Sequence, residues 1–233
     1  MSAFSWTTSA PAALLWDMDG TLIDSEPLWW AAERELVEMG DGTWTDADAL
    51  ALVGSDLANA ARVLIAHGAP LSVPEIVDFL NLRVSAGLQR EIPWRKHGSQ
   101  TLVRMADLGL TCALVTMSHT PVVDGFINAI APGTFAAVIT GDKVAKGKPD
   151  PEPYLHAARM LGVEITDCIA VEDSVTGITS AYASGARTIG IKAVTEVPVW
   201  SGLSRVASLD QITPAVLDII MSGGTVDLLG PNA

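Results

Sequence analysis

The stretch that decides the fold is AALLWDMDGT, residues 12–21. Its first half is apolar and runs directly into Asp17 and Asp19, with only Met18 between the two acids. Because residues i and i+2 of a strand point to the same face, this pattern predicts a buried strand that brings two carboxylates to one place. Two carboxylates held close together raise the pKa of one of them unless a cation lies nearby. A solvated loop with two acids is the alternative, so the rest of the chain decides.

The composition is typical of a globular protein with a substantial core. The chain has 233 residues, of which 49% are hydrophobic and 18% are charged, enough for one large domain or two smaller ones. The net charge of −13 argues against nucleic acid and against an anionic membrane surface as partners. No apolar run reaches membrane-spanning length. The first basic residue is Arg34, so the N-terminal segment does not have the positive charge with which a signal peptide begins. We expect a cytoplasmic protein, either a monomer or a weak homodimer.

Beyond residue 100, short apolar runs alternate with segments that carry helix signals. The segments between the runs begin with capping residues such as Ser99 and Ser174 and end at glycines such as Gly109 and Gly185. Strands that alternate with helices predict βαβ units and a parallel sheet. Together with residues 12–16, the runs expected to be buried strands are 111–116, 136–140, 168–173 and 187–192.

The stretch from residue 27 to about residue 95 has helix patterns and no clear strand. Pro27 can begin one helix, and a second helical region covers roughly residues 46–66, with a break at Gly54. A third helix begins with the capping box Ser72–Glu75. The sequence therefore predicts an all-helical insert between the first strand and the remaining strands.

These patterns predict an α/β protein of two domains. We expect residues 1–26 and 96–233 to form the α/β core domain and residues 27–95 to form a helical cap domain. One more helix is expected at about residues 214–221, followed by a loose glycine-rich terminus.

Polar side chains gather where the expected strands end. Thr116 ends the second strand, the segment GDKVAKGKPDPEPY (residues 141–154) follows the third, and Glu172-Asp173-Ser174 ends the fourth. In an open parallel sheet, ligands bind beyond the carboxyl ends of the strands. We therefore expect these groups to lie with Asp17 and Asp19 in one site.

At these residues the chain resembles the haloacid dehalogenase-like superfamily, in particular its phosphatase branch with a helical cap. The motifs that carry the resemblance are DMDGT at 17–21, Thr116, GKPDPEPY at 147–154 and EDS at 172–174, in that order. The insert at residues 27–95 matches the position and the helical character of the cap in that family. The resemblance implies a Rossmann-like parallel sheet core with an inserted helical cap.

The resemblance also implies catalytic roles. Asp17 would be the nucleophile that forms an aspartyl-phosphate. Asp19 would protonate the leaving alcohol and then activate water. Thr116 and Lys148 would hold the oxygens of the transferring phosphoryl group. Lys146 stays an alternative to Lys148 because it lies only two residues away.

For the metal, the resemblance implies Mg²⁺ bound by Asp17 and Asp173, with the backbone carbonyl of Asp19 and a supporting Glu172. A divalent cation would make the paired acids tolerable, because it neutralises the charge of one of them. The expected substrate is a small phosphorylated metabolite. DSEPLWWAAE at 24–33 is similar to the opening of the cap in bacterial sugar-phosphate phosphatases, which favours a sugar phosphate.

Other activities on the same scaffold differ in specific residues. Dehalogenase relatives lack the second acid, and this chain has Asp19. The β-phosphoglucomutase-like branch has an arginine soon after a glycine of the cap, whereas here Gly54 is followed by no arginine until Arg62. A phosphosugar mutase stays the alternative function. A non-catalytic binding module is a further alternative, because fold alone does not imply activity.

Overall fold

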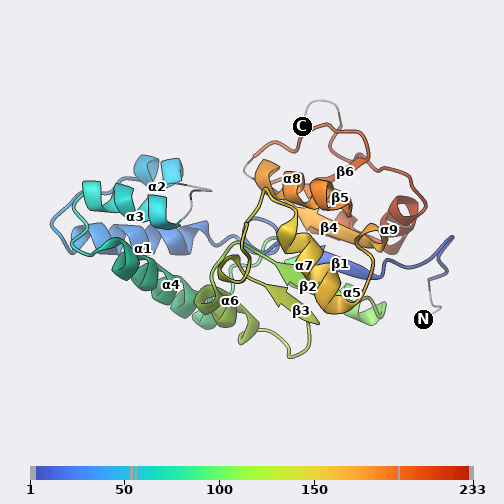
Figure 1. The fold of residues 1–233 in the computed structure, drawn as a ribbon, viewed down its shortest axis with the longest axis horizontal. Coiled ribbons are helices and arrows are strands. Elements are labelled where there is room, and N and C mark those ends of the chain that lie inside the picture. Colours follow the sequence, from blue (N-terminus) through green and yellow to red (C-terminus); the bar gives the residue numbers. More distant parts are fainter. Residues whose placement is uncertain (1–3, 53–54, 56, 194, 231–233) are drawn as a thin grey trace. The chain divides into compact units, whose positions relative to one another are not determined.

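Figure 1 shows the computed structural model of the chain, which describes residues 4–52, 55, 57–193 and 195–230. The chain divides into two compact units. The sheet unit contains the described residues up to Asp24, Trp94–Ser118 and the residues from Ala131 onward, and the helical unit contains Ser25–Pro93 and His119–Ile130. The sequence-based boundaries assigned residues 119–130 to the core domain. In the structure they group with the insert, because a helix in this segment packs against the longest helix of the insert.

The sheet unit is built on a parallel sheet in which β1 lies between β2 and β4. The strands follow the order β3-β2-β1-β4-β5-β6, and every neighbouring pair is parallel. The carboxyl ends of all the strands therefore meet at one edge of the sheet, and the expected α/β fold is confirmed. The strands are β1 Ala13–Trp16, β2 Cys112–Val115, β3 Ala137–Ile139, β4 Cys168–Glu172, β5 Arg187–Ile191 and β6 Leu203–Val206.

The last strand, β6, was missed by the sequence analysis, which predicted five strands where the described residues form six. Its sequence LSRV contains Ser204 and Arg205, so it does not have the apolar character of the other runs, although all of its residues are buried. The prediction of a loose terminus was also wrong for the described part of the tail. The backbone N–H of Arg205 donates to Val226 O at 2.7 Å, and that of Leu228 donates to Arg205 O at 2.8 Å.

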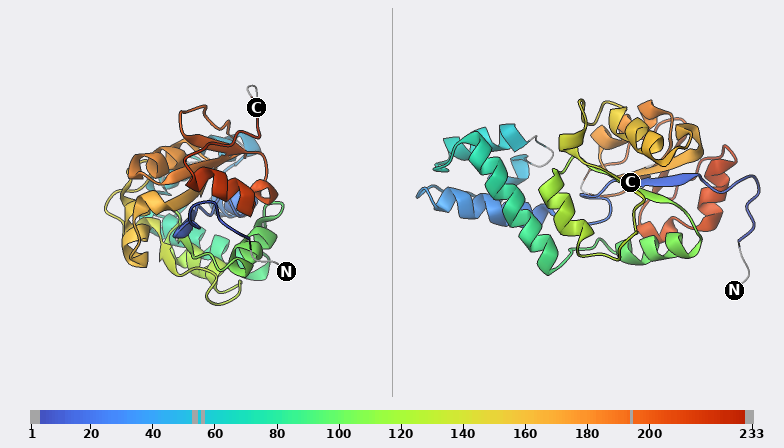
Figure 2. Two further views of the ribbon diagram at one scale, coloured as in Figure 1. Left: turned by 90° about the vertical axis from the view of Figure 1, so that its right-hand side faces the viewer. Right: turned by 60° about the horizontal axis from the view of Figure 1, so that its bottom comes forward.

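Helices cover both faces of the sheet. In the right-hand view of Figure 2, α7 and α8 lie on one side of the sheet, and α5 and α9 lie on the other. The hydroxyl of Ser174 accepts a hydrogen bond from the N–H of Gly177 at 3.0 Å, which confirms Ser174 as the cap of α8. These helices are α5 Gly98–Asp107, α7 Glu152–Leu161, α8 Val175–Ser184 and α9 Pro214–Met221.

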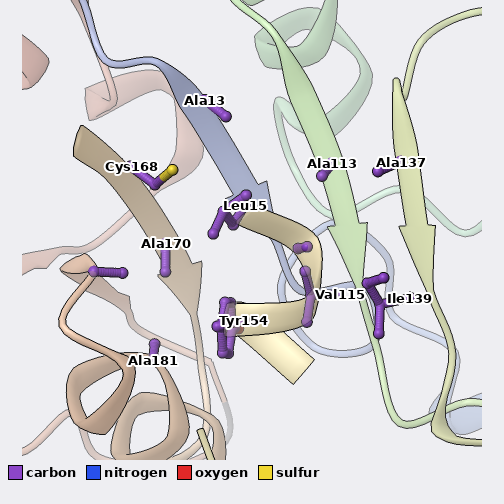
Figure 3. Close-up of a cluster of buried hydrophobic side chains, with 12 residues drawn as sticks. Ala13, Leu15, Ala113, Val115, Ala137, Ile139, Tyr154, Cys168, Ala170 and Ala181 are labelled. Atoms are coloured by element: carbon purple, nitrogen blue, oxygen red, sulfur yellow. The ribbon is translucent and has the colours of Figure 1, made fainter. Parts of the chain in front are cut away.

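One apolar cluster fills the space between the sheet and helices α7 and α8 (Figure 3). Alternate residues of the central strands point into it, as the period of a strand requires. Most of these side chains are alanines, and Tyr154 at the start of α7 is the largest of them. The members labelled in Figure 3 are Ala13, Leu15, Ala113, Val115, Ala137, Ile139, Tyr154, Cys168, Ala170 and Ala181.

The helical unit has its own core. The capping box predicted for the long helix is present, with the backbone N–H of Ser72 donating to Glu75 Oε2 at 2.9 Å. Leu36, Trp44 and Leu80 are among the buried side chains of this unit. The break predicted at Gly54 lies outside the described residues. The helices are α1 Glu26–Glu38, α2 Asp46–Leu52, α3 Leu57–Ala66, α4 Val73–Arg90 and α6 Thr120–Ile127. Among the described residues, no helix is both long enough and apolar enough to span a bilayer.

Candidate active site

Asp17 and Lys148 form the centre of the site. Asp17 directly follows β1 and is only 6% exposed. The ammonium Nζ of Lys148 donates to Asp17 Oδ1 at 2.7 Å and to the backbone carbonyl of Val115 at 2.8 Å. It also lies 2.6 Å from Glu172 Oε1. Lys148 therefore joins the carboxyl ends of β1, β2 and β4.

The carboxylates near Lys148 are crowded, and two of them have raised pKa values. Burial, together with the charge of Asp17, raises the pKa of Glu172 to about 7 and that of Asp173 to about 8. Burial also disfavours the charged form of Lys148, but the carboxylates of Asp17 and Glu172 outweigh it and raise the pKa of Lys148. The lysine therefore stays charged while negative charge remains in excess around it.

The acidic groups of this edge fit a divalent cation. One oxygen each of Asp17, Glu172 and Asp173 can be chosen so that all lie within 4.8 Å of one another. Asp17 Oδ2 and Glu172 Oε2 are buried and accept no hydrogen bond from any described residue. An all-oxygen set with unused buried lone pairs is the chemistry that hard divalent cations prefer. Asp173 is held in place by the hydroxyl of Thr21, which donates to its Oδ1 at 3.2 Å.

The second acid of the opening motif has different partners. Asp19 Oδ2 accepts hydrogen bonds from Ser118 Oγ at 2.7 Å and from Thr116 Oγ1 at 3.2 Å. Met18, which lies between the two acids in the sequence, is fully buried. The two carboxylates therefore sit in different environments, one against an ammonium and the other against hydroxyl donors.

Two glycines let the backbone approach the acids closely. A Cβ at Gly20, where φ is +80°, would lie 2.2 Å from Asp173 Oδ2. A Cβ at Gly177 would lie 1.9–2.1 Å from three atoms of the Glu172 carboxyl group. Any larger residue at either position would displace a carboxylate of the cluster.

The two candidate lysines lie in different places. Lys146 Nζ is 3.7 Å from Asp150, and its side chain is 73% exposed. The side chain of Lys148 is 5% exposed and contacts Asp17. The structure thus brings Asp17, Lys148, Glu172 and Asp173 into one cluster and joins Asp19 to Thr116, and it leaves Lys146 at the surface.

Several residues near these groups were not singled out as site residues. Tyr154 and Gly177 lie inside the segments GKPDPEPY and EDSVTG, which offered a signal for both. The sequence offered no signal for Arg95, because its partners are backbone carbonyls. Its guanidinium donates to Gly20 O and, at 2.5 Å, to Lys192 O. Beside Gly20 and Arg95 lies a cavity of about 380 Å³, also lined by Asp24, Trp94, Lys96 and Ala193.

The sequence model of the haloacid dehalogenase-like hydrolases matches residues 14–191, which include Asp17, Asp19, Thr116, Lys148, Glu172 and Asp173. The chain belongs to this family. As a haloacid dehalogenase-like hydrolase it has curated relatives that are named as phosphatases. It is 28% identical over 211 residues to hexitol phosphatase A of Escherichia coli K12, covering 85% of this chain and 92% of that protein.

Two further similarities bear on the same site. The chain is 28% identical over 214 residues to the bifunctional riboflavin kinase/FMN phosphatase of Arabidopsis thaliana, covering 89% of this chain but only 54% of that longer protein. Among solved structures, CbbY from Rhodobacter sphaeroides in complex with phosphate is 26% identical, with a TM-score of 0.75. That match covers 85% of this chain and 94% of CbbY.

Proposed function

We propose that this hydrolase is a Mg²⁺-dependent phosphatase that cleaves the phosphate monoester of a small polyhydroxylated metabolite, such as a sugar phosphate. One observation carries the proposal. Asp17 is held by Lys148 through Oδ1, while its buried Oδ2 accepts no hydrogen bond from any described residue, and a second carboxylate follows two residues later. That arrangement suits a nucleophile next to an acid–base group.

In the first step, an oxygen of Asp17 bonds to phosphorus, and the bond between phosphorus and the ester oxygen breaks. Asp19 gives its proton to the departing alcohol. Lys148 holds the Asp17 carboxylate in place through Oδ1. The product of this step is an aspartyl-phosphate on Asp17 and a free alcohol.

In the second step, Asp19 is ionised and takes a proton from water. The water oxygen bonds to phosphorus, the bond between Asp17 and phosphorus breaks, and inorganic phosphate leaves. The hydroxyl of Ser118 holds the Asp19 carboxylate in one orientation for both proton transfers. Thr116 has a single O–H, now directed at Asp19, which would turn to a phosphoryl oxygen when substrate binds, and Lys148 would supply its positive charge to the phosphoryl group.

Asp17 and Asp173 would hold Mg²⁺, with the backbone carbonyl of Asp19 and a supporting Glu172. When bound, the cation supplies positive charge for the phosphoryl oxygens. The protein's contribution is a buried, prearranged set of oxygen ligands at one edge of the sheet. A cytoplasmic location and a monomer or weak homodimer belong to the same proposal.

The relatives support a small polyhydroxylated substrate. Hexitol phosphatase A is named for a sugar-alcohol phosphate, and CbbY was solved with phosphate. A phosphosugar mutase is the second candidate, and the cap segment that bears on it, with Gly54 and Asp56, lies partly outside the described residues. The products of the reaction separate the two activities.

The test is phosphate release from a panel of hexose, pentose and hexitol phosphates. We expect turnover with Mg²⁺, and its loss in excess EDTA and in Asp17→Asn. Undiminished activity in chelator would contradict the metal proposal. Isomerisation of glucose 1-phosphate without phosphate release would replace the phosphatase with a mutase, and the absence of any turnover across the panel would favour a non-catalytic module.

A further inference from the structure

Tyr154 connects the apolar core of the sheet unit to the candidate site. It lies near the start of α7, is fully buried, and packs in the cluster of Figure 3 with Val115, Ala170 and Ala181. Its hydroxyl leaves this apolar cluster and donates to Glu172 Oε1 at 2.6 Å. A carboxylate oxygen only accepts hydrogen bonds, so the phenol O–H is the donor in this contact.

The contacts of Glu172 are unevenly divided between its two oxygens. Tyr154 Oη and Lys148 Nζ both contact Oε1, each at 2.6 Å. Oε2 is buried and accepts no hydrogen bond from any described residue. The two donors therefore hold the carboxylate by one oxygen and leave the other for the acidic cluster.

The carboxylate is also confined from the other side. The backbone at Gly177, in the first turn of α8, is so close that an added Cβ would overlap the carboxyl group of Glu172. Lys148 Nζ lies 5.3 Å from the centre of the Tyr154 ring, within the range of a cation–π contact. Tyr154 thus contacts both charged partners of the ion pair.

We propose that Tyr154 is a positioning residue of the active site, which orients Glu172 so that Oε1 faces Lys148 and Oε2 serves the bound cation. The inference rests on the proposed function of the site. The ring fills the core in either case, so only the hydroxyl is needed for this role. Outer partners of metal-site carboxylates typically contribute 10–100-fold to metal affinity or activity.

The two tyrosines of the chain allow a matched experiment. Tyr154→Phe removes the hydroxyl that contacts Glu172, and Tyr182→Phe removes one that donates to Ser201 O at 3.0 Å. For Tyr154→Phe we expect roughly a tenfold loss in kcat, a KM for substrate within about threefold, and roughly a tenfold rise in the Mg²⁺ dissociation constant measured by calorimetry. Tyr182→Phe is expected to leave all three unchanged.

A second comparison separates positioning from a loss of core packing. If Tyr154 acts through Glu172, Tyr154→Phe lowers kcat by less than about threefold in a Glu172→Gln background, because coupled residues are not additive. The same tenfold loss in both backgrounds would overturn the proposal, as would wild-type Mg²⁺ affinity and kcat in Tyr154→Phe. If the wild-type protein turned over no substrate, the proposed function would fail, and the Mg²⁺ affinities would still decide the role of Tyr154.

Discussion

The Lys148 ammonium contacts groups from three neighbouring strand ends, and its loss should disturb the carboxylates of the site. Without it, the buried Asp17 and Glu172 carboxylates would face each other without a counter-charge. Lys146, two positions earlier, lies at the surface and pairs with Asp150 instead. The two lysines therefore form a natural pair for comparison.

Lys148→Ala is expected to lower kcat by about 10²-fold or more, because it removes a preorganised cation from a buried site. Lys146→Ala is expected to stay within about twofold of the wild type, since an exposed ion pair contributes little. Steady-state kinetics of both variants measure the difference. A larger loss in Lys146→Ala would move the phosphate-binding role to that residue.

The different surroundings of the two acids predict different defects. Asp17→Asn is expected to remove both turnover and the phosphorylated enzyme, because the nucleophile is lost. Asp19→Asn keeps the nucleophile but loses the group that protonates the alcohol and activates water, so turnover falls by about 10²–10⁴-fold. Acid quenching followed by mass spectrometry of the intact protein detects the aspartyl-phosphate. Near-normal turnover in Asp17→Asn would show that another residue is the nucleophile.

At the scale of elements, α1 carries an acid into the core of the helical unit. Glu33 is only 6% exposed, and Trp44 Nε1 donates to its Oε2 at 3.3 Å. Burial raises the pKa of Glu33 to about 7, against the effect of the hydrogen bond from Trp44 and with a further rise from the charge of Glu26. The folded state thus binds this proton more tightly than the unfolded state.

This shift predicts a pH-dependent stability. The ordinary pKa is 4.5 and the folded value is about 7, so the penalty begins as the pH rises through 4.5 and is complete above about 7. Glu33→Gln stays neutral and can still accept from Trp44, so it should raise the Tm more at pH 8 than at pH 5. Thermal melts measure the effect, with Glu38→Gln at an exposed position of the same helix as the control. An equal gain at both pH values would contradict the assignment.

The elements that could be predicted are those whose signals are local. The run at residues 12–16, the cap Ser174 and the capping box Ser72–Glu75 all lie in the sequence as short patterns, and the structure places an element at each. Strand β6 carries no such pattern, because Ser204 and Arg205 become buried only when the fold is complete.

The same distinction applies to the site. Asp17, Asp19, Lys148 and the EDS segment follow strand ends, so their meeting could be expected from a parallel sheet alone. The contact between Tyr154 and Glu172 depends on how α7 lies over the sheet, which no short pattern specifies.

At the scale of the whole molecule, all of the predicted catalytic groups lie in the sheet unit. The helical unit is built from Ser25–Pro93 and His119–Ile130, and it contributes none of them. The grouping of the second segment could not be predicted, because it depends on the packing of α6 against α4, where Gly125 approaches the backbone of Ser85. We expect changes in the helical unit to alter which substrate is preferred, and changes in the sheet unit to alter whether any substrate is cleaved.

The pairing of the tail with β6 has a consequence for how copies of the molecule behave in solution. An outer strand with unpaired backbone groups invites a strand from another molecule, which leads to aggregation. Here Val226 and Leu228 occupy the backbone groups of Arg205 and so shield that border of the sheet. A chain truncated after Ser222 should therefore self-associate, which light scattering would detect against a full-length control. We therefore expect the residues beyond α9 to prevent polymerisation by covering the edge of β6.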